Sequence, residues 1–270
     1  MHPVLFKLGP LEIHAYGLML AISFVLGILL AARRAKRLGI DPNRIMDLGV
    51  LVAVSAIVGA RLFYVAFHLD EFRGHWTDTF NPFQSTGQVG IGGLTLLGGV
   101  ILAILTSYIY LRLKNLSFLR VADVVAPSLG LGIFLTRIGC FLNGCCFGVP
   151  CHLPWAVSFP YGSPAHYHYG PVPIHPTQLY SSLGGLVMFG ALLALDRHRR
   201  FDGYLFYFFL VFYGIGRFLV DFVRYYEPSM VLVRLGSVTI SMNQGISLLM
   251  LAAGIIGLVL GWRRLRATAA

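Results

Sequence analysis

Residues 16–32 read YGLMLAISFVLGILLAA, a run that is apolar on every side and carries no charged residue. A helix needs about 20 residues, each rising about 1.5 Å, to cross a hydrocarbon core about 30 Å thick. A transmembrane strand would instead show about ten residues in which apolar and polar side chains alternate. The stretch is therefore typical of a membrane-spanning helix.

The rest of the chain is similarly apolar. Of its 270 residues, 57% are hydrophobic and only 12% are charged, and the mean hydropathy is +0.74. A soluble domain does not need so many apolar residues for its core. We expect an all-α integral membrane protein that forms one domain over residues 1–270 and has seven transmembrane helices, at 15–32, 45–68, 90–111, 121–142, 178–195, 203–223 and 237–260.

The basic residues predict the orientation of these helices. The cluster RRAKR at 33–37 follows the first run, so we do not expect this run to be a cleavable signal peptide. By the positive-inside rule the N-terminus lies outside and the C-terminus in the cytoplasm. The net charge of +10 is then explained by topology and needs no nucleic-acid partner. The basic residues of the predicted cytoplasmic side are Arg33, Arg34, Lys36, Arg37, Arg44, Arg112, Lys114, Arg120, Arg197, Arg199, Arg200, Arg263, Arg264 and Arg266.

Three further arginines fall within or at the ends of the apolar runs. A charged side chain near the bilayer centre costs about 3 kcal/mol or more, so each needs a partner or a function. For Arg61, an ion pair with Asp123 or Asp221, or extension toward the surface, is as good an expectation as a functional role. Arg137 and Arg217 lie toward the outward ends of their runs, where two guanidinium groups suit bidentate binding of a phosphate.

Other polar residues are predicted on the same outward side. An anionic phospholipid is the expected ligand there, because its phosphate can meet the arginines while its tails remain in the membrane. These additional residues are His14, Tyr16, His175, Gln178, Tyr180, Asp221 and Arg224.

The long outward loop at 143–177 holds seven prolines and no Lys or Arg, so it cannot be one regular helix. It either covers the helix ends as a packed structure or closes over a substrate.

All four cysteines lie around the start of this loop, in the pattern C-x4-C-C-x4-C. Cys140 is near the end of the preceding run, and Cys145, Cys146 and Cys151 are in the loop. Two disulfides are the favoured interpretation for an outward, oxidising location. A zinc site with a nearby histidine is an alternative, although the spacing is not the usual C-x2-C. A third interpretation makes Cys145 a reactive thiolate beside Arg137. The histidines considered for the zinc site are His152, His166, His168 and His175.

Five stretches together resemble the prolipoprotein diacylglyceryl transferase family in order and spacing. The resemblance covers nearly the whole chain. It implies transfer of the diacylglyceryl group of phosphatidylglycerol to the cysteine thiol in a prolipoprotein signal sequence, in the inner membrane of a bacterium, with no cofactor or metal. The stretches are IHAYGLML at 13–20, RIGCFLNGCCFG at 137–148, IHPTQLY at 174–180, GIGRFLVDFVR at 214–224 and ISMNQGIS at 240–247.

The resemblance also implies roles for the site residues. Arg137 would bind the lipid phosphate and Arg217 would stabilise the departing phosphate, because the developing negative charge needs cations in a site of low dielectric constant. The implied catalytic residues are His14, Tyr16, Arg137, Arg217 and Asp221. The implied substrate-binding residues are Arg137, Asn143, Gly144, His175, Gln178, Tyr180 and Arg224.

The chain departs from the family pattern at four positions. Cys140 and Cys145 stand where the family has Asn and Glu, Leu97 where it has His, and Ser181 where it has Glu. A carboxylate and an imidazole that would take the proton of the incoming thiol are therefore missing. Either His14 or Asp221 supplies the base, or the chain is a divergent member with another acceptor.

Two other function classes share features of this sequence. A catalytically altered relative that acts as a lipid-binding, transport or thiol-redox membrane protein remains an alternative. A retinal-binding photoreceptor also has seven helices, but it needs a lysine in the last helix, and residues 237–260 contain none.

Overall fold

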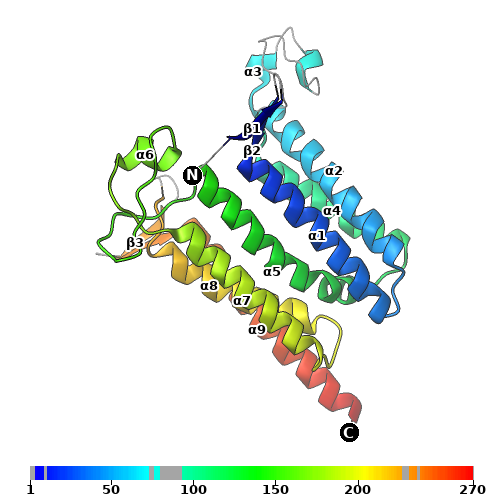
Figure 1. Cartoon of the computed structure of the whole chain (residues 1–270). Helices are drawn as coiled ribbons and strands as arrows, with labels where there is room; N and C mark the ends of the chain where they lie inside the picture. Colours follow the sequence, from blue (N-terminus) through cyan, green and yellow to red (C-terminus); the bar gives the residue numbers. More distant parts are fainter. Residues whose placement is uncertain are drawn as a thin grey trace. The chain divides into compact units, whose positions relative to one another are not determined.

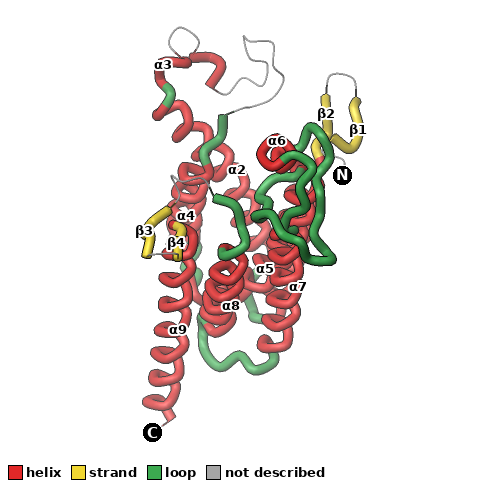
Figure 2. Tube along the Cα trace, turned by 90° about the vertical axis from the view of Figure 1, so that its left-hand side faces the viewer, coloured by secondary structure: helices red, strands yellow, loops and turns green. Residues whose placement is uncertain are grey.

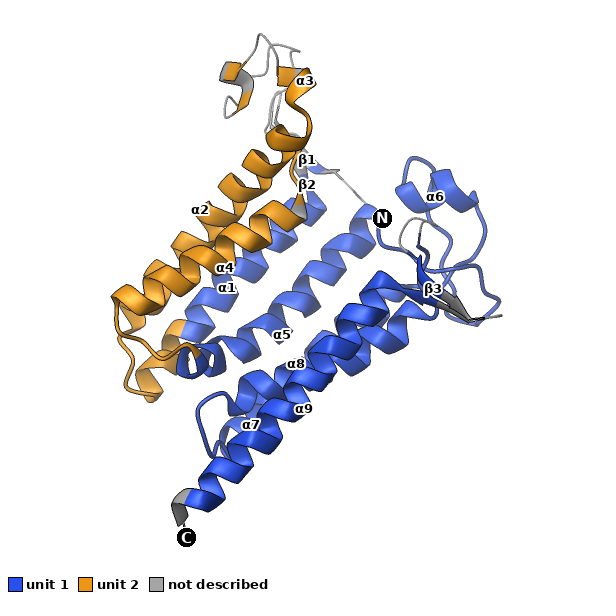
Figure 3. Ribbon diagram, turned by 180° about the vertical axis from the view of Figure 1, so that it is seen from behind, with its two compact units in different colours: residues 1–7, 12–31, 119–270 blue, residues 8–11, 32–118 orange. Residues whose placement is uncertain are grey.

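The computed structural model describes residues 4–8, 11–72, 76–79, 93–226, 231–235 and 238–269. The chain forms two compact units (Figure 3). Unit 1 comprises residues 1–7, 12–31 and 119–270, and unit 2 comprises residues 8–11 and 32–118. The predicted all-helical architecture is confirmed, and each unit is built from long helices.

Unit 2 is built around a close helix pair, α2 (Pro42–Phe67) and α4 (Leu96–Leu113). A Cβ atom at Gly59 would lie 2.5 Å from the carbonyl oxygen of Gly98, so only glycines allow the two backbones to approach this closely. The short helices α3 (Leu69–Phe72) and η1 (Trp76–Thr79) follow α2.

Arg61 has a structural role in unit 2. Its side chain is buried, its Nε donates to the carbonyl oxygen of Thr79 at 2.6 Å, and its Nη1 donates to that of Gly93 at 3.2 Å. The guanidinium also lies 5.0 Å from the ring centroid of Phe72. Arg61 therefore binds backbone carbonyl groups next to α2. The side chain does not extend to the surface, and the aspartates expected as its partners form ion pairs with other arginines, Asp123 with Arg199 and Asp221 with Arg217.

Unit 1 contains the remaining helices and two short two-stranded sheets, except that Leu8, Leu11 and Phe118 belong to unit 2. Figure 1 shows α7 and α8 side by side, and α9 also packs on α8. The helices are α1 (Ala15–Arg37, whose last residues belong to unit 2), α5 (Phe118–Asn143), α6 (Pro164–Tyr169), α7 (Thr177–Asp196), α8 (Tyr204–Asp221) and α9 (Met242–Ala269). The strands are β1 (Val4–Leu8), β2 (Leu11–His14), β3 (Val231–Leu235) and β4 (Val238–Ser241).

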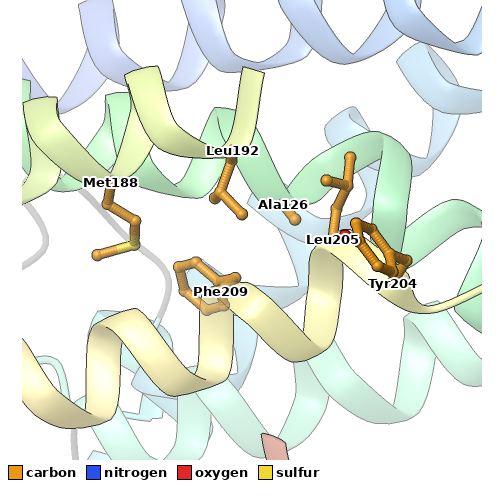
Figure 4. Packing of buried hydrophobic residues seen from close by; sticks show 6 residues of the cluster. All are labelled: Ala126, Met188, Leu192, Tyr204, Leu205 and Phe209. Atoms are coloured by element: carbon orange, nitrogen blue, oxygen red, sulfur yellow. The ribbon is translucent and has the colours of Figure 1, made fainter. Parts of the chain in front are cut away.

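The core of unit 1 lies where α5, α7 and α8 meet. Figure 4 shows Leu192 of α7 and Phe209 of α8 within this cluster, next to Ala126 of α5. Leu192, Leu205 and Ala126 have no solvent exposure at all. The full buried cluster is Ala126, Met188, Leu192, Tyr204, Leu205 and Phe209.

Asp123 fixes one end of this unit. Its carboxylate has no solvent exposure and accepts hydrogen bonds from Arg199 Nε at 3.0 Å, from the backbone N–H of Gly203 at 2.8 Å and from that of Phe206 at 3.0 Å. The N–H groups of Gly203 and Phe206 have no partner within the first turn of α8, so Asp123 satisfies them. The start of α5, the end of α7 and the start of α8 therefore meet at this end.

Six helices are long and apolar enough to cross a membrane, by length and composition: α1, α2, α5, α7, α8 and α9. The apolar stretch of α4, Leu97–Leu113, is shorter. Large apolar side chains are exposed on these helices, among them Ile104 at 65%, Leu183 at 62% and Leu249 at 71%. Such exposure suits contact with lipid. The chain is thus a multi-pass membrane protein, while a seventh span remains a prediction.

The observed helix bounds differ from the predicted ones where the chain forms hairpins. The last helix begins at Met242 instead of residue 237, because Val238–Ser241 pairs as β4 with β3 in antiparallel register. The four short strands were not predicted. Most of residues 70–89, between α2 and α4, lie outside the described residues.

Candidate functional site

The predicted site residues all belong to unit 1. Arg137 lies near the C-terminal end of α5, and Asp221 at that of α8. Gln178 and Tyr16 lie near the N-terminal ends of α7 and α1. This end of the unit is opposite to the end that Asp123 fixes. Figure 2 shows the segment between α5 and α7 as an irregular loop that carries the short helix α6.

The loop leaves α5 through a sharp turn. Gly144 has φ +71° and Cys146 has φ +61°, both in the left-handed region that favours glycine. A Cβ atom at Gly144 would also lie 2.7 Å from Cβ of Ser163. Gly144 thus has a steric role in this turn, and its predicted contact with substrate remains untested.

The N-terminal turn of α7 holds this loop in place. Thr177 Oγ1 donates to the carbonyl oxygen of Cys146 at 2.9 Å, and Gln178 Nε2 donates to that of Cys145 at 2.8 Å. Both side chains are fully buried. Gln178 therefore acts on the cysteine backbone, while its Oε1 has no hydrogen-bond partner among the described residues.

Three cysteines converge at the turn. The Sγ atoms of Cys140, Cys145 and Cys146 all lie within 4.8 Å of one another, and Cys151 is not part of this group. All four cysteines are free thiols, so the predicted two disulfides are not formed in this structure. The thiols of Cys140 and Cys145 hydrogen-bond to Cys146, and with the nearby cations of Arg224 and Arg137 they lower the pKa of Cys146 despite its burial.

Arg137 lies beside these thiols. Its guanidinium interacts with Cys140, Cys146 and Tyr213, and it forms a hydrogen bond with the Cys146 side chain. Tyr16, in the first turn of α1, interacts with the same three thiols and with Arg137. Close packing of α1 on α5 brings Tyr16 here, since a Cβ atom at Gly139 would lie 3.3 Å from Cα of Tyr16.

Arg217 and Asp221 form a buried ion pair one helical turn apart, with Arg217 Nη2 3.2 Å from Asp221 Oδ1. The hydroxyl of Tyr226 joins both, because it donates to Asp221 Oδ1 at 2.6 Å and accepts from Arg217 Nη2 at 2.5 Å. Ser241 Oγ donates to the second carboxylate oxygen at 3.2 Å. Burial raises the pKa of Tyr226, which keeps its hydroxyl protonated.

Two guanidinium nitrogens in this region have no hydrogen-bond partner among the described residues. They are Nη1 of Arg217 and Nε of Arg224, and both are buried. The guanidinium of Arg224 lies 5.3 Å from the ring centroid of Tyr226, and the charges of Arg217 and Arg224 act on each other. Buried donors without acceptors are costly, so these two atoms suit an anion.

The remaining predicted residues are arranged around the loop. His175 Nδ1 lies 3.2 Å from the hydroxyl of Tyr180, which also accepts from Trp155 Nε1 at 2.8 Å. Asn143 is the last residue of α5, and its side chain hydrogen-bonds to Cys145. His14 ends β2 and is exposed.

Sequence reasoning missed four residues of the site: Thr177, Tyr226, Ser241 and Gln244. One signal for them is readable, since Ser241 and Gln244 form a capping box at the start of α9. The N–H of Ser241 donates to Gln244 Oε1 at 2.9 Å, and the N–H of Gln244 donates to Ser241 Oγ at 3.0 Å. No comparable sequence pattern indicates the contact of Tyr226 with Arg217.

A cavity of about 410 Å³ lies in unit 1 at the other end of α8 and α9, lined by Leu119, Tyr207 and Arg264 among others. None of the predicted site residues lines it, so it is not the candidate site.

Comparison with known proteins shows which family the chain is similar to. A family model described as "Prolipoprotein diacylglyceryl transferase" matches residues 3–260. The chain is 38% identical to the phosphatidylglycerol–prolipoprotein diacylglyceryl transferase of Idiomarina loihiensis, over 95% of this chain and 92% of that protein. It is 36% identical to the protein of the same name from Geobacter sulfurreducens, over 97% and 96% of the two chains.

Proposed function

The chain belongs to the prolipoprotein diacylglyceryl transferase family, and we propose that it transfers the diacylglyceryl group of phosphatidylglycerol to the cysteine thiol of prolipoprotein signal sequences. This transfer is the first step of lipoprotein maturation. The products are a thioether-linked lipoprotein precursor and glycerol phosphate.

The observation that carries this proposal is the group of three arginines at one end of unit 1. Arg137 and Arg224 lie near Cys146, and Arg217 and Arg224 lie near Tyr226. Among the described residues, buried nitrogens of Arg217 and Arg224 have no acceptor. A phosphodiester presents several charged oxygens to such donors. Its acyl chains can stay in the membrane that the apolar helices occupy.

The residues divide between two tasks. Arg137 binds the phosphate of phosphatidylglycerol next to the cysteine turn, where the acceptor thiol must approach. Arg217, held by Asp221 and Tyr226, and Arg224 stabilise the second negative charge that develops on the phosphate as it leaves. Tyr16 and His14 are both exposed, and we assign to them contact with the entering lipid headgroup.

Purified protein in detergent tests the proposal directly. With phosphatidylglycerol and a peptide that carries the acceptor cysteine, mass spectrometry should find the peptide with one added diacylglyceryl group. A peptide with serine in place of this cysteine should remain unmodified, because the nucleophile is a thiolate. Binding of phosphatidylglycerol without any modified peptide would favour a lipid-binding or transport role instead.

We propose the inner membrane of a bacterium as the location, with the cysteine turn at the outward end. The basic residues support this orientation. In unit 1 the basic segment Arg197–Arg200 lies at the Asp123 end, opposite to the site. A membrane-impermeant reagent directed to position 161, where Tyr161 is 84% exposed, should label the protein in intact spheroplasts. The same reagent directed to position 198 should label it only after lysis. Reaction of His198 from outside would reverse the orientation.

A further inference from the structure

We propose that Cys140, Cys145 and Cys146 bind one zinc ion through their thiolates and leave its fourth coordination position to the thiol of the acceptor peptide. This inference rests on the proposed transferase function and names the group that activates the acceptor. It replaces the expectation that the site needs no metal.

The positions of the three sulfurs fit a zinc ion. Zinc binds cysteine sulfur at about 2.3 Å, so two sulfurs of a tetrahedral site lie about 3.8 Å apart. The three Sγ atoms already lie within 4.8 Å of one another, and small side-chain rotations bring them to this spacing. Zinc sites with three protein ligands and one open position are typical of catalysis, whereas structural sites have four protein ligands.

The backbone holds the three thiols in this arrangement without a metal. The N–H of Cys145 donates to the carbonyl oxygen of Cys140 at 3.2 Å, which closes the turn. Thr177 and Gln178 hold the carbonyl groups of Cys146 and Cys145 from the opposite side. A ligand set that is fixed before binding loses little conformational entropy when the ion binds.

The charges around the cluster also fit. Three thiolates and one zinc ion carry a net charge of −1, and the thiolate of the acceptor would bring it to −2. The guanidinium groups of Arg137 and Arg224 both act on Cys146, and together they supply two positive charges. A buried ion cluster of this kind requires such compensation.

The zinc ion activates the acceptor thiol in place of a protein side chain. Asp221 is occupied, since it accepts hydrogen bonds from Tyr226 and Ser241 and forms an ion pair with Arg217. His14 is exposed at the end of β2. A thiol that coordinates zinc is deprotonated outright, so the metal can replace a general base.

The transfer step is then a substitution at carbon, in which the acceptor thiolate displaces the phosphate. The acceptor thiol gives its proton to water when its sulfur binds the zinc. A lone pair of this sulfur forms a bond to the glyceryl CH₂ carbon, and the bond from that carbon to the phosphate oxygen breaks. Its electron pair leaves with glycerol phosphate. A thiolate and the singly charged lipid thus become a neutral thioether and a doubly charged phosphate monoester.

Metal analysis of the full-length protein, purified without chelator, is the first test. We expect about one zinc per chain in the wild type, and at least a fivefold lower content in Cys145→Ala and Cys140→Ala. The matched control is Cys151→Ala, which removes a cysteine outside the cluster and should keep the zinc. The variants must elute as single monodisperse species, so that a loss of zinc is not a loss of folding.

Cobalt(II) in place of zinc gives a readout that is independent of activity. The thiolate-to-cobalt charge-transfer band should appear in the wild type and in Cys151→Ala, and be absent in Cys145→Ala. Addition of the acceptor peptide should increase this band by about one third, because a fourth sulfur joins three. The peptide with serine in place of the acceptor cysteine should leave the band unchanged.

The two proposals fail in different ways. If the wild type transfers lipid at full rate with less than a tenth of an equivalent of zinc, the zinc assignment is wrong and the transferase function stands. If the protein binds zinc but the acceptor peptide does not change the cobalt band, the open-position role is wrong. Uptake of copper(I) but not zinc, or a disulfide within the cluster of the purified protein, also overturns the inference.

Discussion

Replacement of Arg137 by lysine should lower kcat/KM for diacylglyceryl transfer by about 100- to 1,000-fold while the protein still folds. The guanidinium lies beside Cys140 and Cys146, and in the proposed function it binds the lipid phosphate there. Lysine keeps the charge but presents a single point of contact, so it cannot reproduce the two parallel hydrogen bonds of a planar guanidinium. The peptide transfer assay with phosphatidylglycerol measures this change.

Arg120→Lys is the matched control, because Arg120 lies in the same helix and its side chain is 52% exposed, far from the site. It should keep wild-type activity within about twofold. Arg137→Lys protein with unchanged kcat/KM would remove Arg137 from phosphate binding. If the melting temperature falls in parallel with the activity, Arg137 contributes to the stability of the fold instead.

Replacement of Asp123 by alanine should reduce the free energy of unfolding by about 3–5 kcal/mol, because it leaves three buried or partly buried donors without their acceptor. These donors are Arg199 Nε and the N–H groups of Gly203 and Phe206. The expected fall in the melting temperature is roughly 6–20 °C, which thermal unfolding of the full chain in detergent measures.

Asp202→Ala serves as its control. Asp202 pairs with the same arginine, but its side chain is 41% exposed, and exposed ion pairs contribute only about 0–1 kcal/mol. At a temperature where both variants are folded, each should transfer lipid at the wild-type rate, since Asp123 lies at the end of unit 1 opposite to the site. Equal stability of the two variants would contradict the role assigned to Asp123.

Most of the helices could be predicted from the sequence, because a membrane span needs a long apolar run and the chain shows such runs clearly. The hairpin of β3 and β4 could not, since its short strands adjoin the apolar run of α9 and share its composition. The pairing of Asp123 with Arg199 was also not predictable, as these residues are 76 positions apart.

The site was predictable as a set of residues but not as a geometry. Arg137 and Arg217 stand out because charge is costly in an apolar run, and the cysteines stand out by their spacing. Sequence favoured disulfides, whereas the turn at Gly144 and Cys146 directs three of the thiols toward one another without bonding them. That outcome depends on the contacts from Thr177 and Gln178, which no local pattern reveals.

The length of α9 has a consequence for how the protein tolerates different membranes. Its 28 residues span about 42 Å, about 12 Å more than the hydrocarbon core requires. The excess lies at the C-terminal end, where Arg263, Arg264 and Arg266 follow the last apolar turn. Hydrophobic mismatch in a thinner or thicker bilayer can therefore be absorbed by tilting α9 and by the long arginine side chains. At the other end of the helix, Ser241 of the capping box keeps its hydrogen bond to Asp221.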